Sequence, residues 1–145
     1  MTRAIMIAAP RSGGGKTTAT LGILSALRAR NIEIQAAKTG PDYIDPAFHE
    51  AVTGRSSLNL DSWVMAPELL ESMLARAAEG ADLLVVESAM GLFDGLLGPA
   101  DARGAPSDIA ARFSIPVILV LDVSGQGQSA AAIAHGFATL DPALY

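Results

Sequence analysis

The chain has 145 residues, of which 50% are hydrophobic and 17% are charged; this composition excludes a disordered chain and supplies the core of about one domain. No apolar run reaches the roughly 18 residues of a membrane-spanning helix, and Met1–Pro10 leads into a glycine-rich loop without room for a signal peptide. The absence of cysteine excludes disulfides, thiolate metal sites and a cysteine nucleophile, and the net charge of −5 argues against non-specific binding to nucleic acid. The sequence therefore predicts a soluble cytoplasmic protein without a membrane or nucleic-acid partner.

Four apolar runs predict β-strands, and segments with helical patterns separate them. The predicted strands are Ala4–Ala8, Ile32–Lys38, Leu83–Glu87 and Ile115–Asp122. The first, third and fourth runs lack the alternation of a half-exposed strand, which is typical of parallel strands covered by helices on both faces. The predicted helices are Gly15–Arg30, Pro67–Glu79, Pro106–Phe113 and Gln126–Ala138. This alternation predicts an α/β fold with a doubly wound, mainly parallel sheet.

Two connections, Thr39–Ala66 and Ser88–Ala105, are much longer than the two to six residues usual in such units. Each begins at the C-terminal end of a predicted strand. Ligands of open α/β sheets bind at this edge, so we expect both segments to be functional loops.

The stretch "APRSGGGKTT", from Ala9 to Thr18, follows the first strand and opens the first helix, as a phosphate-binding loop does. Pro10 replaces the first glycine of the usual pattern, but most of the amides that meet phosphate follow that position. The alternative is a strand–helix turn with a solvated lysine. The predicted nucleotide-binding residues are Ser12, Gly13, Gly14, Gly15, Lys16, Thr17 and Thr18.

A nucleotide bound with Mg²⁺ also needs a carboxylate at a neighbouring strand end, and "LLVVE" supplies Glu87 there. The alternative is an exposed acid that ends a strand. Asp122, at the end of "VILVLD", is a weaker candidate, since it could equally orient the loops.

Three motifs together resemble the cobyrinic (hydrogenobyrinic) acid a,c-diamide synthase family. They are the glycine-rich loop, "GPDYIDPAFH" from Gly40 to His49 with "TGRSSLNLDSW" after it, and "VVESAMGLFDG" from Val85 to Gly95. The resemblance runs through essentially the whole chain. It implies a P-loop fold similar to dethiobiotin synthetase, and ATP- and Mg²⁺-dependent phosphorylation of the a- and c-side-chain carboxylates of a corrin ring in cobalamin biosynthesis. Ammonia from glutamine, released by a C-terminal glutaminase domain, then forms the amides.

The resemblance also implies roles for individual residues. Lys16 and Thr17 hold phosphate and Mg²⁺, while Glu87 and Asp45 are further metal ligands. The residues implied to face the reacting carboxylate or the metal, and so to join Lys16 in catalysis, are Asp42, Tyr43, Asp45 and Asp94.

Other residues of these motifs have plainer interpretations. Turn formation beside the neighbouring prolines is the alternative for Asp42 and Asp45. Histidines at positions such as His49 and His135 are more often structural than catalytic. We expect Trp63 and Phe93 to pack the loops down.

The chain departs from the family pattern in two respects. Ser88 and Ala89 stand where the family usually has glycine and valine, which removes glycine's backbone freedom after Glu87. We expect the glutaminase domain to be absent, since the chain has no cysteine, and the synthetase domain, residues 1–145, to be incomplete at its C-terminal end. An unpaired sheet edge there would favour self-association, so a homo-oligomer is possible.

Three other functions stay open from the sequence. "RSGGGKT" resembles the loop of partition and septum-site ATPases, with Arg11 at their signature-lysine position, although these switch proteins lack "GPDYIDPAFH". Cobyric acid synthase and nickel-sirohydrochlorin amide synthase share parts of the motifs. The chain could also bind phosphate without turnover.

Overall fold

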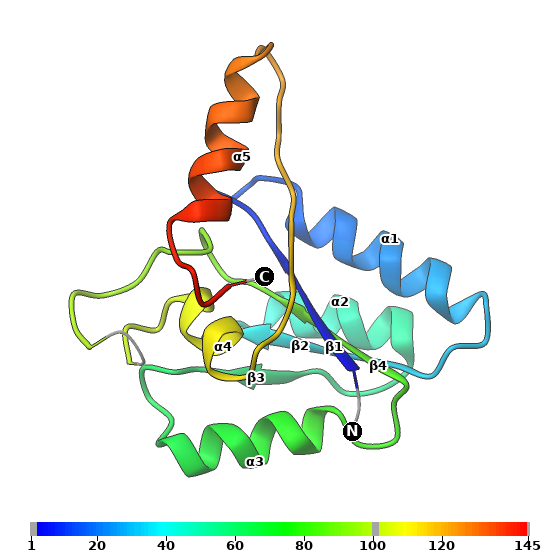
Figure 1. The fold of residues 1–145 in the computed structure, drawn as a ribbon. Coiled ribbons are helices and arrows are strands. Elements are labelled where there is room, and N and C mark those ends of the chain that lie inside the picture. The colour runs from blue at the N-terminus through cyan, green and yellow to red at the C-terminus, as the bar shows by residue number, and fades with distance from the viewer. Residues whose placement is uncertain (1–2, 100–101, 145) are drawn as a thin grey trace.

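The computed structural model describes residues 3–99 and 102–144; Met1, Thr2, Ala100, Asp101 and Tyr145 lie outside these ranges, and with them both ends of the predicted domain. Strands and helices alternate along the described chain (Figure 1). The strands are β1 (Arg3–Ala8), β2 (Ile34–Thr39), β3 (Leu58–Leu60), β4 (Leu83–Glu87) and β5 (Val117–Leu119). The helices are α1 (Lys16–Arg28), α2 (Ile44–Thr53), α3 (Pro67–Ala77), α4 (Pro106–Arg112) and α5 (Ser129–Thr139).

The five strands form one parallel sheet in the order β3-β2-β4-β1-β5. β4 therefore lies at the centre, with Val85 paired to Ile5 of β1 and to Ala36 of β2. Because all strands run the same way, their C-terminal ends meet at one edge of the sheet. The predicted fold class, α/β with a parallel sheet, is confirmed.

Helices cover both faces of this sheet, because successive side chains of each strand point to opposite sides. On one face, Ile7 and Val85 pack with Leu24 of α1 and Val52 of α2. On the other, the hydrophobic core is formed by residues of the strands, α3 and α4, chief among them Met6, Ala8, Leu84, Val86, Leu70 and Ile109. The result is a three-layer arrangement with the sheet in the middle (Figure 1).

The prediction of which strands are buried on both faces was wrong for two of them. β2, whose sequence alternates, is buried at every position from Ile34 to Thr39, because it lies between β3 and β4. β5 is shorter than the predicted Ile115–Asp122 and is only partly buried, with Ile118 46% exposed. Its place at the edge of the described sheet leaves one side of the strand without a neighbour.

The first long connection is not a simple loop. It contains α2 and β3, both of which were missed in the sequence. Asp42 explains the start of the helix, since its carboxylate Oδ1 accepts the backbone N–H groups of Ile44 at 2.8 Å and Asp45 at 3.2 Å. β3 has only three residues and is held by its pairing with β2, so little in its own sequence marks it as a strand.

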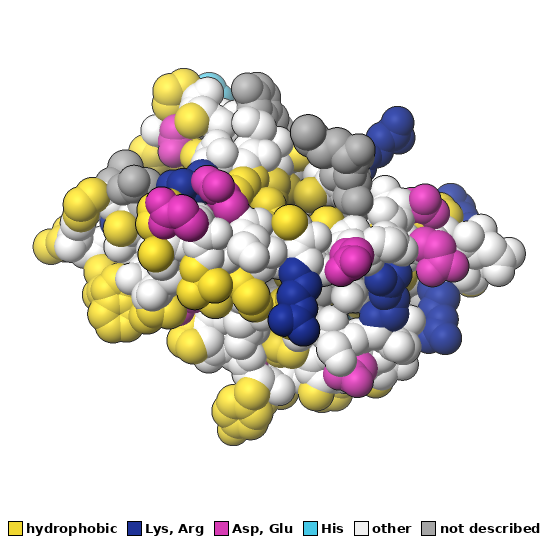
Figure 2. Space-filling model, turned by 90° about the horizontal axis from the view of Figure 1, so that it is seen from below, with side chains coloured by type: hydrophobic (Ala, Val, Ile, Leu, Met, Phe, Trp, Pro, Cys, Tyr) yellow, Lys and Arg dark blue, Asp and Glu magenta, His cyan; other side chains and the backbone are white. Residues whose placement is uncertain are grey.

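Seen from the side of α3, hydrophobic side chains are more frequent toward the left, where the loops after β3 and β4 lie, and Lys and Arg toward the right (Figure 2). Trp63, in the loop after β3, is 62% exposed, although its Cβ lies close to the backbone of Gly104. The expectation that Trp63 packs the loops down was therefore wrong. Phe93 does pack, 5.3 Å from the ring of Phe137 on α5.

Truncation of a leucine at the sheet's centre should cost far more stability than truncation of one on the surface. Leu84 of β4 is 1% exposed and Leu69 of α3 is 50% exposed. Leu84→Ala should lower the free energy of unfolding by about 2–5 kcal/mol, because it leaves a cavity. Leu69→Ala should lower it by less than about 1 kcal/mol. Urea unfolding of both variants measures the difference, and equal losses would contradict the described packing.

Candidate functional site

The glycine-rich loop between β1 and α1 has a backbone that only glycine adopts readily. Gly13 has φ +69° and Gly15, which precedes the first residue of α1, has φ +87°. A Cβ on Gly14 would lie 3.0 Å from the Cβ of Ala9. The backbone therefore favours glycine at positions 13 and 15, and the close approach of Ala9 favours it at position 14. The loop leads directly into the N-terminus of a helix of 13 residues.

Lys16, the first residue of α1, is folded back over this loop. Its Nζ donates to the carbonyl oxygen of Arg11 at 3.0 Å, and the residue is only 7% exposed. Burial and the positive charge of Lys38 lower the pKa of Lys16, while Glu87, Asp45 and Asp94 oppose that shift. The three carboxylates are residues that the sequence motifs pointed to, and the structure brings them around one ammonium group.

A second lysine, Lys38 at the end of β2, forms a buried ion pair with Glu87 at the end of β4. The distance from Lys38 Nζ to Glu87 Oε1 is 3.0 Å, and the two side chains are 3% and 0% exposed. Lys38 also contacts the carboxylate of Asp45 at 2.5 Å and the carbonyl oxygen of Ser88 at 3.3 Å. Thr17 donates its hydroxyl to the same Glu87 Oε1 at 2.6 Å.

The carboxylate of Glu87 is ionised at neutral pH despite its burial. Burial alone would raise its pKa, but hydrogen bonds from His49 and Thr17 and the charge of Lys38 outweigh burial and lower the pKa from 4.5 to about 2. The hydrogen bond from His49 Nε2 reaches the other carboxylate oxygen, Oε2, at 2.8 Å. The alternative interpretation of Glu87 as an exposed acid was wrong.

The acidic residues of the first motif lie at the beginning of α2, but with different surroundings. The carboxylate of Asp45 contacts Lys38 directly. Asp42 accepts hydrogen bonds from the first turn of the helix, and its other carboxylate oxygen lies 3.9 Å from Lys38 Nζ. For Asp42, the interpretation as a turn former is therefore correct, and its carboxylate is also within reach of the lysine. Tyr43 is 85% exposed and belongs to none of these contacts.

The second motif packs directly against the glycine-rich loop. Leu92 N–H donates to the carbonyl oxygen of Ala9 at 2.9 Å, and a Cβ on Gly91 would lie 2.5 Å from the carbonyl oxygen of Pro10. Asp94 is exposed and turned back, accepting the N–H of Gly91 at 3.0 Å. Ser88 does not have a positive φ, so the serine after Glu87 needs none of the conformational freedom of glycine.

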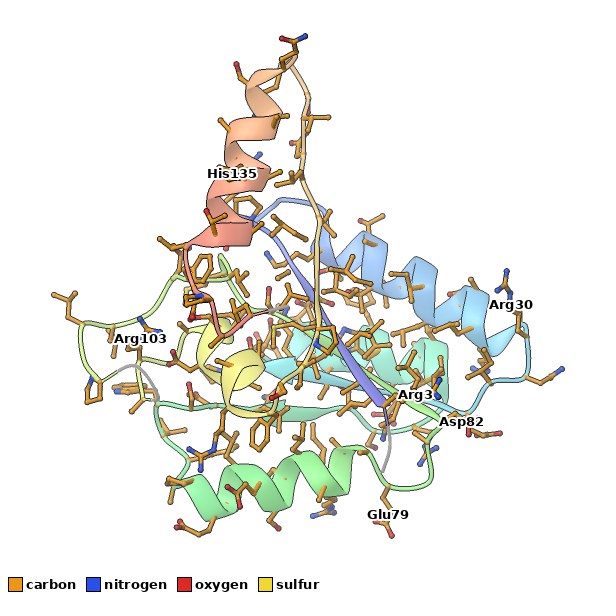
Figure 3. All side chains as sticks on the ribbon, in the orientation of Figure 1. Arg3, Arg30, Glu79, Asp82, Arg103 and His135 are labelled. Atoms are coloured by element: carbon orange, nitrogen blue, oxygen red, sulfur yellow. The ribbon has the colours of Figure 1, made fainter. Side chains whose placement is uncertain are left out.

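The two long connections are joined to each other at Asp108, the third residue of α4. Its buried carboxylate accepts the backbone and side-chain N–H groups of Arg103 at 2.7–3.1 Å and the Ser62 hydroxyl at 3.4 Å. Figure 3 shows Arg103 in the loop on the left, whereas Arg3 and Asp82 are at the opposite end of the strands. The contacts of Asp108 hold both loops beside the C-terminal edge of the sheet.

Three other predicted positions lie at the periphery of the site. Ser12 and Thr18 are exposed, on the loop and in the first turn of α1. Asp122 is exposed and forms an ion pair with Arg11 at 3.2 Å, in agreement with a role in orienting loops. Arg11 thus has a partner within its own chain.

The sequence reasoning missed Lys38, His49 and Ser57 as members of the site. His49 is completely buried, and its Nδ1 lies 3.1 Å from the hydroxyl of Ser57. The signal for His49 was the spacing "DPAFH": residues four apart share a helix face, so recognition of α2 would have paired His49 with Asp45. For Lys38 the signal was its position at the end of a predicted strand, Ile32–Lys38.

The parallel sheet, the glycine-rich loop at a helix N-terminus and the buried lysines define a nucleotide-binding protein of the P-loop α/β class. The chain belongs to the CobQ/CobB/MinD/ParA nucleotide binding domain family, whose model matches residues 5–144.

Curated relatives narrow the resemblance further. The chain is 56% identical over 140 residues to the hydrogenobyrinate a,c-diamide synthase of Mesorhizobium japonicum, and equally to that of Agrobacterium fabrum. Each alignment covers 97% of this chain and 32% of the relative. The synthase of Rhodobacter capsulatus is also 56% identical, over 94% of this chain and 31% of the relative. The chain thus spans about a third of the length of these relatives, and its resemblance to the a,c-diamide synthase family is confirmed.

Solved structures agree on the fold. The chloroplast FtsY of Physcomitrella patens superposes with a TM-score of 0.62 at 21% identity, over 98% of this chain and 48% of that chain. The signal recognition particle receptor FtsY of Elizabethkingia anophelis, solved in complex with GDP, has the same TM-score at 16% identity, over 98% of this chain and 46% of that chain. Within residues 3–99 and 102–144, no helix has the length and hydrophobicity to cross a membrane.

The lowered pKa of Glu87 predicts a specific pH dependence of stability. Because its pKa in the folded chain is about 2, below its ordinary 4.5, Glu87 contributes stability that is present above about pH 4.5 and is lost as the pH falls toward 2. The difference in unfolding free energy between wild type and Glu87→Gln should shrink across this window. Urea unfolding at several pH values measures it. The control is Glu50→Gln, because Glu50 is exposed on α2, and this variant should follow the wild-type curve. If the difference in unfolding free energy between wild type and Glu87→Gln stays constant from pH 5 to 2, the ion pair is contradicted.

Proposed function

We propose that this chain is the ATP-binding synthetase part of a hydrogenobyrinate a,c-diamide synthase, which phosphorylates side-chain carboxylates of a corrin precursor in cobalamin biosynthesis. The observation that carries the proposal is the burial of both of the chain's lysines, Lys16 and Lys38, at the edge where its phosphate loop lies. Lysine is almost never buried without anionic partners, and two of them beside a phosphate loop suit a reaction between anions.

The nucleotide's phosphates fit the loop between β1 and α1. Gly13, Gly14 and Gly15 leave the backbone free of side chains, and the helix N-terminus supplies a partial positive charge. Lys16 donates a hydrogen bond to the Arg11 carbonyl oxygen, and a change of its side-chain conformation would bring its ammonium group to the β- and γ-phosphates. Ser12 and Thr18 lie at the rim of this loop, where their hydroxyls can contact phosphate oxygens.

The side-chain oxygens gathered around the end of β4 are of the kind that Mg²⁺ binds. The Thr17 hydroxyl and a carboxylate oxygen of Glu87, which already meet at 2.6 Å, are hard oxygen ligands, and Asp45 is a third candidate beside Lys38. The described residues contain no group of three or more His, Cys, Asp or Glu side chains that could hold a metal alone, so phosphate oxygens and water would complete the shell. Mg²⁺ would neutralise the charge that develops on the phosphates during transfer.

The reaction follows from the chemistry of a carboxylate, which is too poor an electrophile to react with ammonia directly. One oxygen of the corrin side-chain carboxylate attacks the γ-phosphorus of ATP, and the bond to the β–γ bridging oxygen breaks to release ADP. Ammonia then attacks the acyl carbon, phosphate leaves and the nitrogen loses a proton, which yields the amide. In the relatives' full length, a glutaminase domain is the proposed source of ammonia.

The residues around Lys38 would act on the anionic substrate. Two approaching anions repel each other, and the ammonium groups of Lys16 and Lys38 lower that repulsion. Asp42 and Asp94 border the same edge, where they would orient the reacting carboxylate through the metal or a proton. Tyr43 is exposed beside them and could contact the substrate.

Loss of the phosphate-loop lysine should strongly weaken nucleotide binding without unfolding the chain. Lys16→Ala should weaken the affinity for Mg·ATP by roughly 10- to 100-fold or more, the factor for a lost hydrogen bond to a charged group. Isothermal titration calorimetry measures the affinity, and circular dichroism checks the fold. The control is Arg30→Ala, which removes an exposed cation just beyond α1 (Figure 3). Equal affinities for wild type and Lys16→Ala would refute the assignment of the loop.

Positional isotope exchange tests the phosphorylation step on this chain alone. ATP carrying ¹⁸O in its β–γ bridge should scramble the label only when hydrogenobyrinic acid is present. Glu87→Gln should slow the exchange by about 10²–10³-fold, since it removes charge at the metal and from Lys38. Asp94→Asn should slow exchange but keep the wild-type Mg²⁺ midpoint, because Asp94 makes no contact with Thr17 or Glu87. Exchange that is independent of the tetrapyrrole acid would contradict the proposed substrate.

A further inference from the structure

The two oxygens of the Glu87 carboxylate have separate sets of partners. Oε1 faces Thr17 at 2.6 Å and Lys38 at 3.0 Å, on the side of the phosphate loop. Oε2 contacts His49 Nε2, from helix α2, at 2.8 Å. A carboxylate that is anchored at one oxygen cannot rotate freely, so the direction of the other oxygen is fixed.

His49 is itself held in one orientation. An ionised carboxylate only accepts hydrogen bonds, so Nε2 must carry the proton, and Nδ1 of a neutral ring then accepts from the Ser57 hydroxyl at 3.1 Å. The ring is completely buried. Both of its nitrogens are thus paired, one with the segment before β3 and one with the end of β4.

Helix α2 directs two side chains at the ion pair from the same face. Asp45 contacts Lys38, and His49, four residues further on, contacts Glu87. The cation and the carboxylate of the pair are therefore each held by one residue of α2. An apolar residue at position 49 could fill the space, but it would leave Oε2 without a donor inside the protein.

We propose that His49 is a positioning residue: it holds Glu87 Oε2 so that Oε1 is directed at Thr17 and the metal–nucleotide position beside the phosphate loop. This role rests on the proposed function, because it is exerted on the metal ligand of the nucleotide site. Partners that orient metal ligands typically change metal affinity by about 10- to 100-fold.

Amide side chains can separate the two nitrogens of His49. Glutamine places its N–H₂ near the position of Nε2 and can still donate to Glu87, whereas asparagine reaches only the position of Nδ1. Mn²⁺ can serve as the probe, with electron paramagnetic resonance reporting its binding to the chain in the presence of a non-hydrolysable ATP analogue. His49→Asn should weaken Mn²⁺ binding by about 10- to 100-fold, and His49→Gln by less than about threefold.

The affinity of each variant for the ATP analogue in the absence of metal is the reference for the Mn²⁺ measurements. It should stay within about twofold of wild type in both variants, because the phosphate loop makes no contact with His49. His135→Asn, at the chain's other histidine, exposed on α5 (Figure 3), is the matched control and should change nothing. Equal losses in His49→Asn and His49→Gln would overturn the proposal, since a structural role requires no donor at Nε2.

A double-mutant cycle separates positioning from folding. In a Glu87→Gln background, His49→Asn should weaken Mn²⁺ binding no further; an undiminished additional loss would overturn the proposal. If His49→Asn does not fold, Ser57→Ala supplies the test. This variant removes the hydrogen-bond partner of His49 Nδ1 and should weaken Mn²⁺ binding several-fold. An unchanged affinity would count against the proposal. If the wild-type chain binds no Mn²⁺–nucleotide, the proposed function fails along with the positioning role; normal wild-type binding with an unaffected His49→Asn overturns the positioning role alone.

Discussion

A lysine ammonium and a glutamate carboxylate, 3.0 Å apart and almost inaccessible to water, lie at the C-terminal edge of the sheet. Removal of one partner from such a pair commonly costs about 3–5 kcal/mol, because the other charge is then left buried. The segments that carry Lys38 and Glu87 must therefore be positioned so that both charges stay paired. Three side chains in contact with the pair, those of Thr17, Asp45 and His49, come from two helices that must be in place for the charges to be buried.

The ion pair and the glycine-rich loop are connected through the second motif. Glu87 ends β4, and within a few residues the chain packs against the loop at Gly91 and donates from Leu92 to Ala9. A shift of the loop would therefore be transmitted to the segment that follows Glu87. The glycine-rich loop and the acidic groups near it are thus parts of one contiguous set of contacts, which Asp108 joins to the neighbouring loop.

Local patterns in the sequence were sufficient for the α/β class, four of the five strands and the glycine-rich loop. They succeeded because β1, β4 and β5 lie in largely apolar runs and because the loop needs its glycines in a row. Glu87 was also found, since a carboxylate directly after "LLVV" can only lie at a strand end. Patterns failed for α2 and β3: the helix starts at an aspartate within a proline-containing turn, and the strand has only three residues.

The sequence by itself thus determined four of the strands, the phosphate loop and the strand-end position of Glu87, because each depends on neighbours in the chain. Only the tertiary structure decided that Lys38 is their common cation, that His49 holds Glu87, and that Tyr43 and Trp63 remain exposed. The contacts of Glu87 with His49 and with Lys38 join residues 38 and 49 positions apart, and they depend on the strand order β2-β4-β1. No local pattern encodes that order, because the pairings of β4 with β1 and with β2 join residues far apart in the chain.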